Sequence, residues 1–132
     1  PDILRMNQEE ADDLAGMALG SIEDSADFAQ ALVRRGVART VVVARGPEGS
    51  VLATEGRRLH ARAADVPVRS KVGAGDTFVG AFLLAHAQGL DHAEALRRGV
   101  AAASAAVMTE GTALCRREDA ERLAELCEAR AI

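Results

Sequence analysis

The sequence Val-Gly-Ala-Gly-Asp-Thr-Phe at residues 72–78 is the stretch from which the rest of the chain is best understood. Gly73 and Gly75 carry no Cβ, so the backbone can turn tightly there and come close to a ligand. The residues that follow Asp76 are mostly apolar and indicate a helix that enters a core. A glycine turn that leads into a helix exposes unpaired backbone N–H groups at the positive end of the helix dipole. The stretch therefore predicts an anion site.

Asp76 stands at the mouth of this predicted site, where its charge would repel a phosphate. One interpretation gives the carboxylate a chemical task, namely to take a proton from a hydroxyl that attacks the phosphate. The other interpretation is structural: Asp is a favoured helix N-cap, and the glycines before it form only a tight turn. Residues 72–78 alone leave both interpretations open.

The composition limits the class of protein. The 132 residues have the length of one domain, and 48% of them are hydrophobic, enough to build a core. A net charge of −4 and an aromatic content of 2% argue against a nonspecific nucleic-acid binder. No stretch has the length and character of a membrane span or a leader peptide, so a cytoplasmic protein is expected. Cys115 and Cys127 lack the spacing of a disulfide framework or a zinc site, and buried, inert thiols are expected.

The strands are predicted from runs of β-branched and apolar residues. Thr40–Ala44 is typical of a strand buried on both faces of an α/β sheet. Ser50–Thr54 is predicted to return as a hairpin, followed by a half-exposed antiparallel strand over residues 57–62, so the sheet should be mixed at this end. Ile3–Leu4 is expected to continue a strand that begins earlier. Together with the first residue, Pro1, it predicts that the chain is a piece of a longer protein.

Apolar residues at helical spacing, Leu14 among them, predict helices over residues 9–19, 22–35, 76–88, 91–107 and 118–131, with Leu123 and Leu126 facing inward. Asn7 with Glu10, and Asp91 with Glu94, have the spacing of a capping box. The small residues of helix 91–107, Gly99 among them, fit either tight helix packing or the approach of a flat ligand. No repeat or linker interrupts the chain, and one compact unit is expected.

Three motifs together resemble the C-terminal portion of the ribokinase-like (PfkB) sugar kinases. Residues 72–77 are similar to the Gly-Ala-Gly-Asp signature of this family, Asn7-x-x-Glu10 to its magnesium motif, and residues 44–49 to its ATP loop. The resemblance covers the whole chain. It implies a mostly parallel sheet flanked by helices, with an antiparallel hairpin at one edge. It also implies that residues 1–132 are the ATP-binding and catalytic-base part of the kinase domain, and it favours functional roles for Asp76, Asn7 and Glu10.

Carried over by position, the resemblance implies that Asp76 deprotonates the sugar hydroxyl while the N–H groups of Gly73, Ala74 and Gly75 stabilise charge on the transferred phosphoryl group. Asn7 and Glu10 would hold Mg²⁺ through water. ATP would bind the loop of Ala44, Arg45, Gly46, Pro47, Glu48 and Gly49, with Val100 and Ser104 beside the adenine or ribose. A potassium ion is also implied, held mostly by backbone oxygens around Ser70, Val72, Ala106, Thr109, Gly111 and Ala113.

The sequence departs from the family pattern at two places. Ala44 and Arg45 replace a Ser-Leu pair that is common in the ATP loop, so a hydroxyl contact to phosphate is lost, while Arg45 could supply a charge instead. Ala113 replaces a longer polar residue of many relatives. A carbonyl ligand to potassium would survive that change, whereas a side-chain contact would not.

Within the family, residues 99–106 and 110–115 and the Val at position 72 are most similar to the minor ATP-dependent 6-phosphofructokinase branch. The expected reaction converts fructose 6-phosphate to fructose 1,6-bisphosphate, a glycolytic step. The 1-phosphofructokinases and tagatose-6-phosphate kinases remain alternatives, as does a non-catalytic nucleotide-binding or assembly module. The resemblance places the sugar-binding part and its lid outside this sequence. Residues 1–132 alone are therefore expected to self-associate as a homo-oligomer and to be inactive.

Overall fold

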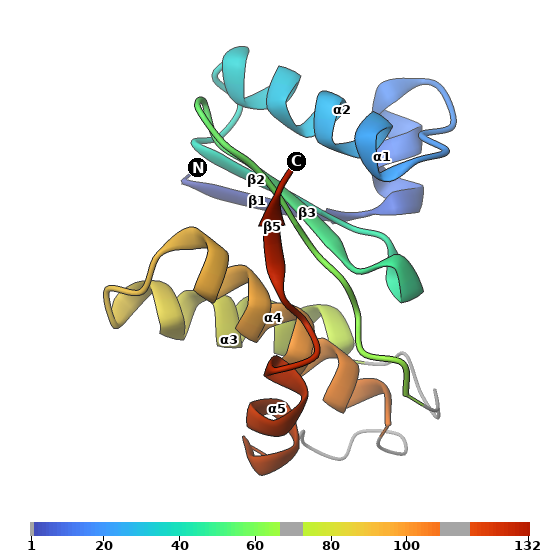
Figure 1. Ribbon diagram of the computed structural model, residues 1–132. Coiled ribbons are helices and arrows are strands. Elements are labelled where there is room, and N and C mark those ends of the chain that lie inside the picture. Colours follow the sequence, from blue (N-terminus) through green and yellow to red (C-terminus); the bar gives the residue numbers. More distant parts are fainter. Residues whose placement is uncertain (1, 67–72, 109–116) are drawn as a thin grey trace. The chain divides into compact units, whose positions relative to one another are not determined.

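Strand β2 (Thr40–Ala44) lies inside a sheet whose strand order is β1-β2-β3-β4-β5 (Figure 1). The other strands are β1 (Ile3–Asn7), β3 (Ser50–Ala53), β4 (Arg58–Ala61) and β5 (Ala129–Ala131). The computed structural model describes residues 2–66, 73–108 and 117–132. β1 pairs with β2 in parallel and β3 pairs with β2 antiparallel, so the predicted mixed sheet is confirmed.

The sequence of β2 explains its position. Val41, Val42 and Val43 are all fully buried, although successive residues of a strand point to opposite faces. The predicted burial on both faces is therefore confirmed. β1 is longer than the two residues that the sequence indicated, because Arg5, Met6 and Asn7 continue the pairing with β2 as far as Ala44.

Two helices, α1 (Gln8–Ala15) and α2 (Ile22–Arg34), cover one face of this sheet (Figure 1). Their inward residues, Ala11, Ala26, Ala29 and Leu32 among them, join alternate strand residues in one apolar cluster that includes Met6, Val41, Val43, Val51 and Ala53. Leu14, one of the apolar residues whose spacing predicted this helix, is 61% exposed. α1 ends at Gly16, whose φ of +72° stops the helix before its predicted end, and Ala11 alone is buried on it.

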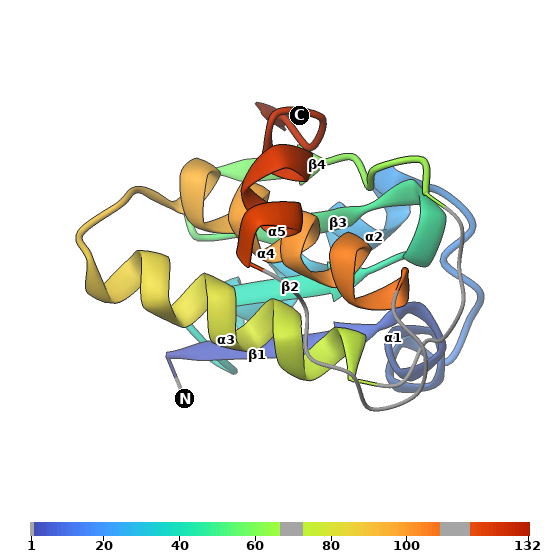
Figure 2. The same ribbon diagram turned by 90° about the horizontal axis from the view of Figure 1, so that it is seen from below.

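Helices α3 (Ala74–Ala87), α4 (His92–Val107) and α5 (Arg117–Ala124) lie between β4 and β5 in the chain. α3 and α4 lie side by side and are joined by a short turn in which Gly89 has a φ of +81° (Figure 2). Phe78 and Phe82 of α3 are buried and stack with their ring centroids 5.8 Å apart. Among the described residues, no helix is long and apolar enough to cross a membrane.

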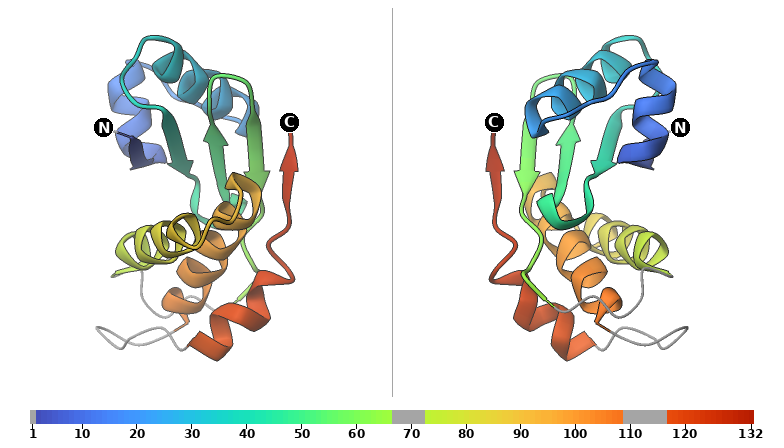
Figure 3. Two further views of the ribbon diagram at one scale, coloured as in Figure 1. Left: turned by 90° about the vertical axis from the view of Figure 1, so that its left-hand side faces the viewer. Right: turned by 90° about the vertical axis from the view of Figure 1, so that its right-hand side faces the viewer.

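The end of the chain differs from the prediction of one helix over residues 118–131. α5 ends at Ala124, and Ala129–Ala131 forms strand β5, which lies at the edge of the sheet beside β4 (Figure 3). Ile132 N donates to Arg58 O at 2.9 Å. Leu123 is buried as predicted, but Leu126 is 59% exposed. Pairing of β5 with the open edge of β4 satisfies the backbone N–H and C=O groups of both strands. These long-range hydrogen bonds outweigh the helix propensity of the residues after Ala124.

The described residues form two compact units instead of the single unit expected from the sequence. One unit contains Pro1–His60 together with Arg130–Ile132, and the other contains Ala61–Ala129. Most of the sheet, with α1 and α2, belongs to the first unit, whereas α3, α4 and α5 and the strand residues Ala61 and Ala129 belong to the second. The candidate site residues are accordingly described within each unit.

Candidate functional site

In the first unit, two predicted motifs begin at the same edge of the sheet. Asn7 is the last residue of β1, Ala44 is the last residue of β2, and the two are partners in the parallel register. The Asn7–Glu10 motif and the loop of residues 45–49 therefore both start at the carboxyl ends of neighbouring parallel strands. This edge is where open α/β sheets bind their ligands.

Asn7 and Glu10 form the predicted capping box at the start of α1. Asn7 Oδ1 accepts a hydrogen bond from Glu10 N at 2.8 Å, and Asn7 N donates to Glu10 Oε1 at 3.1 Å. Both residues are exposed, so an amide and a carboxylate stand together at the sheet edge. Such oxygens suit Mg²⁺, which keeps several waters. Among the described residues no group of three or more His, Cys, Asp or Glu could hold a metal ion.

The loop of residues 45–49 is a tight turn built around a short 3-10 helix, Gly46–Glu48. Gly46 and Gly49 have φ values of +59° and +87°, which residues with a Cβ rarely adopt. Arg45 N donates to Gly49 O at 2.7 Å, and Gly49 N donates to Gly46 O at 3.0 Å. The loop thus closes on itself directly after β2.

The sequence suggested that Arg45 could supply a charge to the phosphates of ATP. In the structure its side chain is directed into the protein instead. Its guanidinium is 1% exposed and binds inside the protein, with Nη1 2.8 Å from Leu19 O and 2.7 Å from Ser25 Oγ. Nη2 contacts Glu48 Oε1 at 3.0 Å. Sequence reasoning missed Leu19 and Ser25 because they lie far from Arg45 in the chain.

In the second unit, Gly73 is the N-cap of α3 with a φ of +81°, and within the described residues no side chain caps this helix start. Asp76 therefore occupies the third helical position, and the interpretation of Asp76 as the N-cap is wrong. Its carboxylate is exposed in the first turn, where the helix dipole favours negative charge. Thr77 Oγ1 donates to Gly73 O at 2.8 Å and fixes the turn.

Val100 and Ser104 of α4, which the resemblance places beside the nucleotide, are both buried. Ser104 Oγ accepts from Ala64 N at 3.2 Å, so the hydroxyl has a structural partner. Burial raises the pKa of the nearby Cys127 thiol, although hydrogen bonds to the Ala64 backbone and to Ser104 oppose this shift. Cys127 is free and buried, as expected.

Gly99 of α4 supports the packing interpretation of the small residues. A Cβ at this position would lie 2.8 Å from the ring of Phe78, so the glycine makes room for an aromatic side chain of α3. Of the residues predicted around potassium, only Ala106 is described, and it is buried. Ser70, Val72, Thr109, Gly111 and Ala113, together with Cys115, lie outside the described residues.

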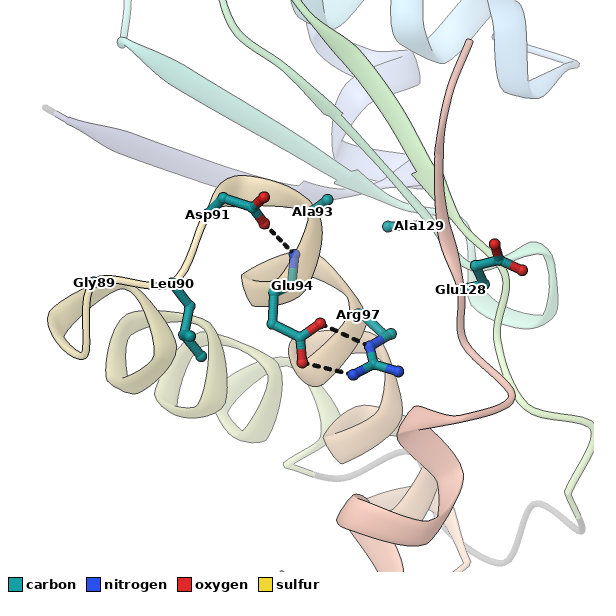
Figure 4. Close-up of a pocket in the computed structure, with 8 residues that line it drawn as sticks. All are labelled: Gly89, Leu90, Asp91, Ala93, Glu94, Arg97, Glu128 and Ala129. Carbon is teal, nitrogen blue, oxygen red and sulfur yellow. Dashed lines mark hydrogen bonds and ion pairs between the residues drawn. The ribbon is translucent and has the colours of Figure 1, made fainter.

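A hollow that the sequence did not predict lies where α3 turns into α4, and Glu128 and Ala129 also line it (Figure 4). Asp91 caps α4 by accepting from Glu94 N at 2.9 Å. In a full capping box the Glu94 side chain would also accept a hydrogen bond from Asp91 N. Here the Glu94 carboxylate instead contacts Arg97 at 2.7 and 3.0 Å and Arg98 at 3.0 Å. The hydrogen bond from Arg97, aided by Arg98, lowers the pKa of Glu94 despite partial burial. This cluster stabilises the start of α4.

Comparison with known proteins gives a consistent result. The chain is 35% identical over 122 residues to ATP-dependent 6-phosphofructokinase isozyme 2 of Escherichia coli, covering 92% of this chain and 40% of the relative. It is 36% identical over 117 residues to 1-phosphofructokinase of Haloferax volcanii, covering 89% and 38%. The crystal structure of phosphofructokinase-2 from Escherichia coli in complex with potassium superposes with a TM-score of 0.88 at 34% identity, covering 95% of this chain and 40% of that one.

The chain thus spans about two fifths of the length of these relatives. A family model described as pfkB family carbohydrate kinase matches residues 1–119. The match includes the Asn7–Glu10 motif, the 44–49 loop and the glycine-rich start of α3. The predicted fold class is confirmed, and the chain belongs to the pfkB family of carbohydrate kinases.

Proposed function

We propose that the full-length protein transfers the γ-phosphoryl group of ATP to a hydroxyl of a sugar phosphate. The observation that carries this proposal is the start of α3, where Asp76 is exposed in the first turn and is not used as a cap. An exposed carboxylate beside a glycine-lined helix start suits the deprotonation of a hydroxyl next to a phosphate. The Asn7–Glu10 motif and the 44–49 loop at one sheet edge support it further.

In this proposal Asp76 accepts the proton of the attacking sugar hydroxyl, and the backbone N–H groups of Gly73, Ala74 and Gly75 stabilise the charge on the phosphoryl oxygens. Residues 44–49 receive ATP, with Val100 and Ser104 near the adenine or ribose. Asn7 and Glu10 would hold Mg²⁺ through water, and that ion would offset the charge of the phosphates. A potassium ion near the anion site is also proposed, which agrees with the potassium complex of the Escherichia coli relative.

The preferred acceptor is fructose 6-phosphate, which would give fructose 1,6-bisphosphate in glycolysis. This choice is supported by the similarity to 6-phosphofructokinase isozyme 2. The similarity to a 1-phosphofructokinase keeps fructose 1-phosphate as a second acceptor to be compared by kcat/KM. Residues 1–132 would be the ATP-binding and catalytic-base part of a larger kinase, which we expect to assemble as a homo-oligomer.

The test is sugar-dependent ADP formation by the full-length protein and its Asp76→Asn variant. Losing the base should lower kcat by about 10²- to 10⁴-fold, with little change in the KM of either substrate. Asp24→Asn is a matched control, because Asp24 is also the third residue of a helix and is also exposed. That variant should keep wild-type kcat.

The outcomes separate the two classes of function. Full turnover in Asp76→Asn would remove the proposed base. A wild-type protein that binds MgATP but shows no turnover with fructose 6-phosphate, fructose 1-phosphate or tagatose 6-phosphate would instead support a non-catalytic nucleotide-binding module.

A further inference from the structure

The guanidinium of Arg45 is anchored on three sides in the first unit. Nη1 donates to Leu19 O at 2.8 Å and to Ser25 Oγ at 2.7 Å, and Nη2 donates to Glu48 Oε1 at 3.0 Å. Leu19 precedes α2, Ser25 lies in its first turn, and Glu48 lies in the loop itself. One side chain therefore ties the 45–49 loop to the start of a helix that is 20 or more residues away in sequence.

A buried guanidinium at this position demands an explanation. The Arg45 side chain is 1% exposed, and its Nε has no partner among the described residues. Removing a cation from water is costly unless its hydrogen bonds and charge are satisfied. Ser25 is fully buried, whereas Glu48 is half exposed, so the charge is balanced from the loop side. An apolar residue at position 45 would avoid this cost. The hydrogen bonds of Arg45 to Leu19, Ser25 and Glu48 are therefore expected to have a structural role of their own.

The loop has reason to need such a tie. Gly46 and Gly49 both have positive φ, and glycine gives the backbone more accessible conformations than any other residue. The loop also has turn bonds between Arg45, Gly46, Glu48 and Gly49. Its backbone is contacted from another element by His60 Nε2, which lies 2.6 Å from Glu48 O. The side-chain bonds of Arg45 to Leu19 and Ser25 join the loop to the region before and at the start of α2.

We propose that Arg45 is a positioning residue which, through Leu19, Ser25 and Glu48, holds the 45–49 loop in the shape that receives the phosphates of ATP. This inference rests on the proposed function of the loop. The side chain of Arg45 is directed into the protein and would not itself contact the nucleotide, which meets the backbone of the loop. Its loss should therefore weaken the binding of ATP while leaving the binding of the sugar unchanged.

The experiment uses the full-length protein with Arg45→Leu, Ser25→Ala and their double variant. Arg45→Leu should raise the KM for MgATP about tenfold and Ser25→Ala about threefold, the range expected for the net effect of ordinary hydrogen bonds. The KM for fructose 6-phosphate should not change in any variant. If Arg45 works through Ser25, the double variant should be no worse than Arg45→Leu alone.

Arg58→Leu is the matched control for the loss of an arginine. Arg58 Nη1 contacts Asp27 Oδ1 at 2.6 Å and joins β4 to α2, but it touches no residue of the loop in the described contacts. Its removal should lower the stability of the fold without raising the KM for MgATP. An equal rise in both arginine variants, or additive effects of Arg45→Leu and Ser25→Ala, would overturn the proposal.

Hydrogen exchange without nucleotide supplies a readout that does not depend on activity. The amides of Arg45 and Gly49, both bonded within the loop, should exchange faster in Arg45→Leu than in the wild type or in Arg58→Leu. If the wild type shows no ATP turnover, the proposed function fails. Hydrogen exchange would still show whether the side chain of Arg45 holds the 45–49 loop in place. Unchanged exchange of these two amides in Arg45→Leu would overturn the proposal that Arg45 positions the loop.

Discussion

At the scale of single residues, Asn7 has two tasks that can be separated. The structure confirms its capping box with Glu10, and the proposed magnesium role uses the same two side chains. Local signals of this kind were readable in the sequence, because a cap depends on residues three positions apart. The tie of Arg45 to Leu19 and Ser25 was not readable, because it depends on how the sheet and α2 bring distant residues together.

Replacing Asn7 by Ala should cost about 1 kcal/mol of stability through the lost cap. It should also raise the Mg²⁺ concentration needed for half-maximal turnover, since one of the proposed ion-binding side chains is gone. Ser21→Ala is the matched control, because Ser21 caps α2 by accepting from Asp24 N at 3.0 Å in the same unit. Magnesium titrations of both variants check this, and an equal shift in the two would leave Asn7 with a capping role only.

At the scale of elements, α3 and α4 fit together around Gly99. Gly99→Ala should destabilise the protein by about 1–3 kcal/mol, because the new methyl group would overlap the buried Phe78 ring. Gly80→Ala on α3 is the control: a Cβ there meets nothing within 4 Å, and the change should stabilise by about 0.5–1 kcal/mol. Urea unfolding of both variants measures the difference. An unchanged free energy of unfolding in Gly99→Ala would mean that α3 and α4 can move apart without loss of stability.

The elements also show where sequence reasoning succeeds and fails. β2 was predicted with correct bounds because a run of β-branched residues leaves little choice of structure. The chain after Ala124 was predicted as helix because its charged composition continues a helical pattern. Its pairing as β5 depends on the free edge of β4, a partner about 70 residues away that no local pattern reports.

At the scale of the whole molecule, stability should depend on the ionisation of Glu94. The hydrogen bond from Arg97 holds the pKa of Glu94 below its ordinary 4.5 in the folded protein. Folding therefore favours the ionised carboxylate. The resulting stability is present above pH 4.5 and is lost as the pH falls towards the lowered pKa of the folded state.

Denaturation of the wild type and Glu94→Gln across this pH range tests the prediction. The variant should be less stable at neutral pH, and the two curves should converge under acid conditions once the wild-type carboxyl is protonated. Asp24→Asn, which removes a carboxylate from the same position of another helix, is the matched control. A constant gap between Glu94→Gln and the wild type at every pH would show that the charge of Glu94 does not contribute.

The junction between β1 and α1 has no intervening residue, since β1 ends at Asn7 and α1 begins at Gln8. Asn7 thus belongs both to the hydrogen-bonded ladder of the sheet and to the cap of the helix. Because Asn7 takes part in both elements, its backbone is expected to move only together with the sheet. In the proposed function, this corner would hold the Asn7 side chain at a fixed place relative to the end of β2.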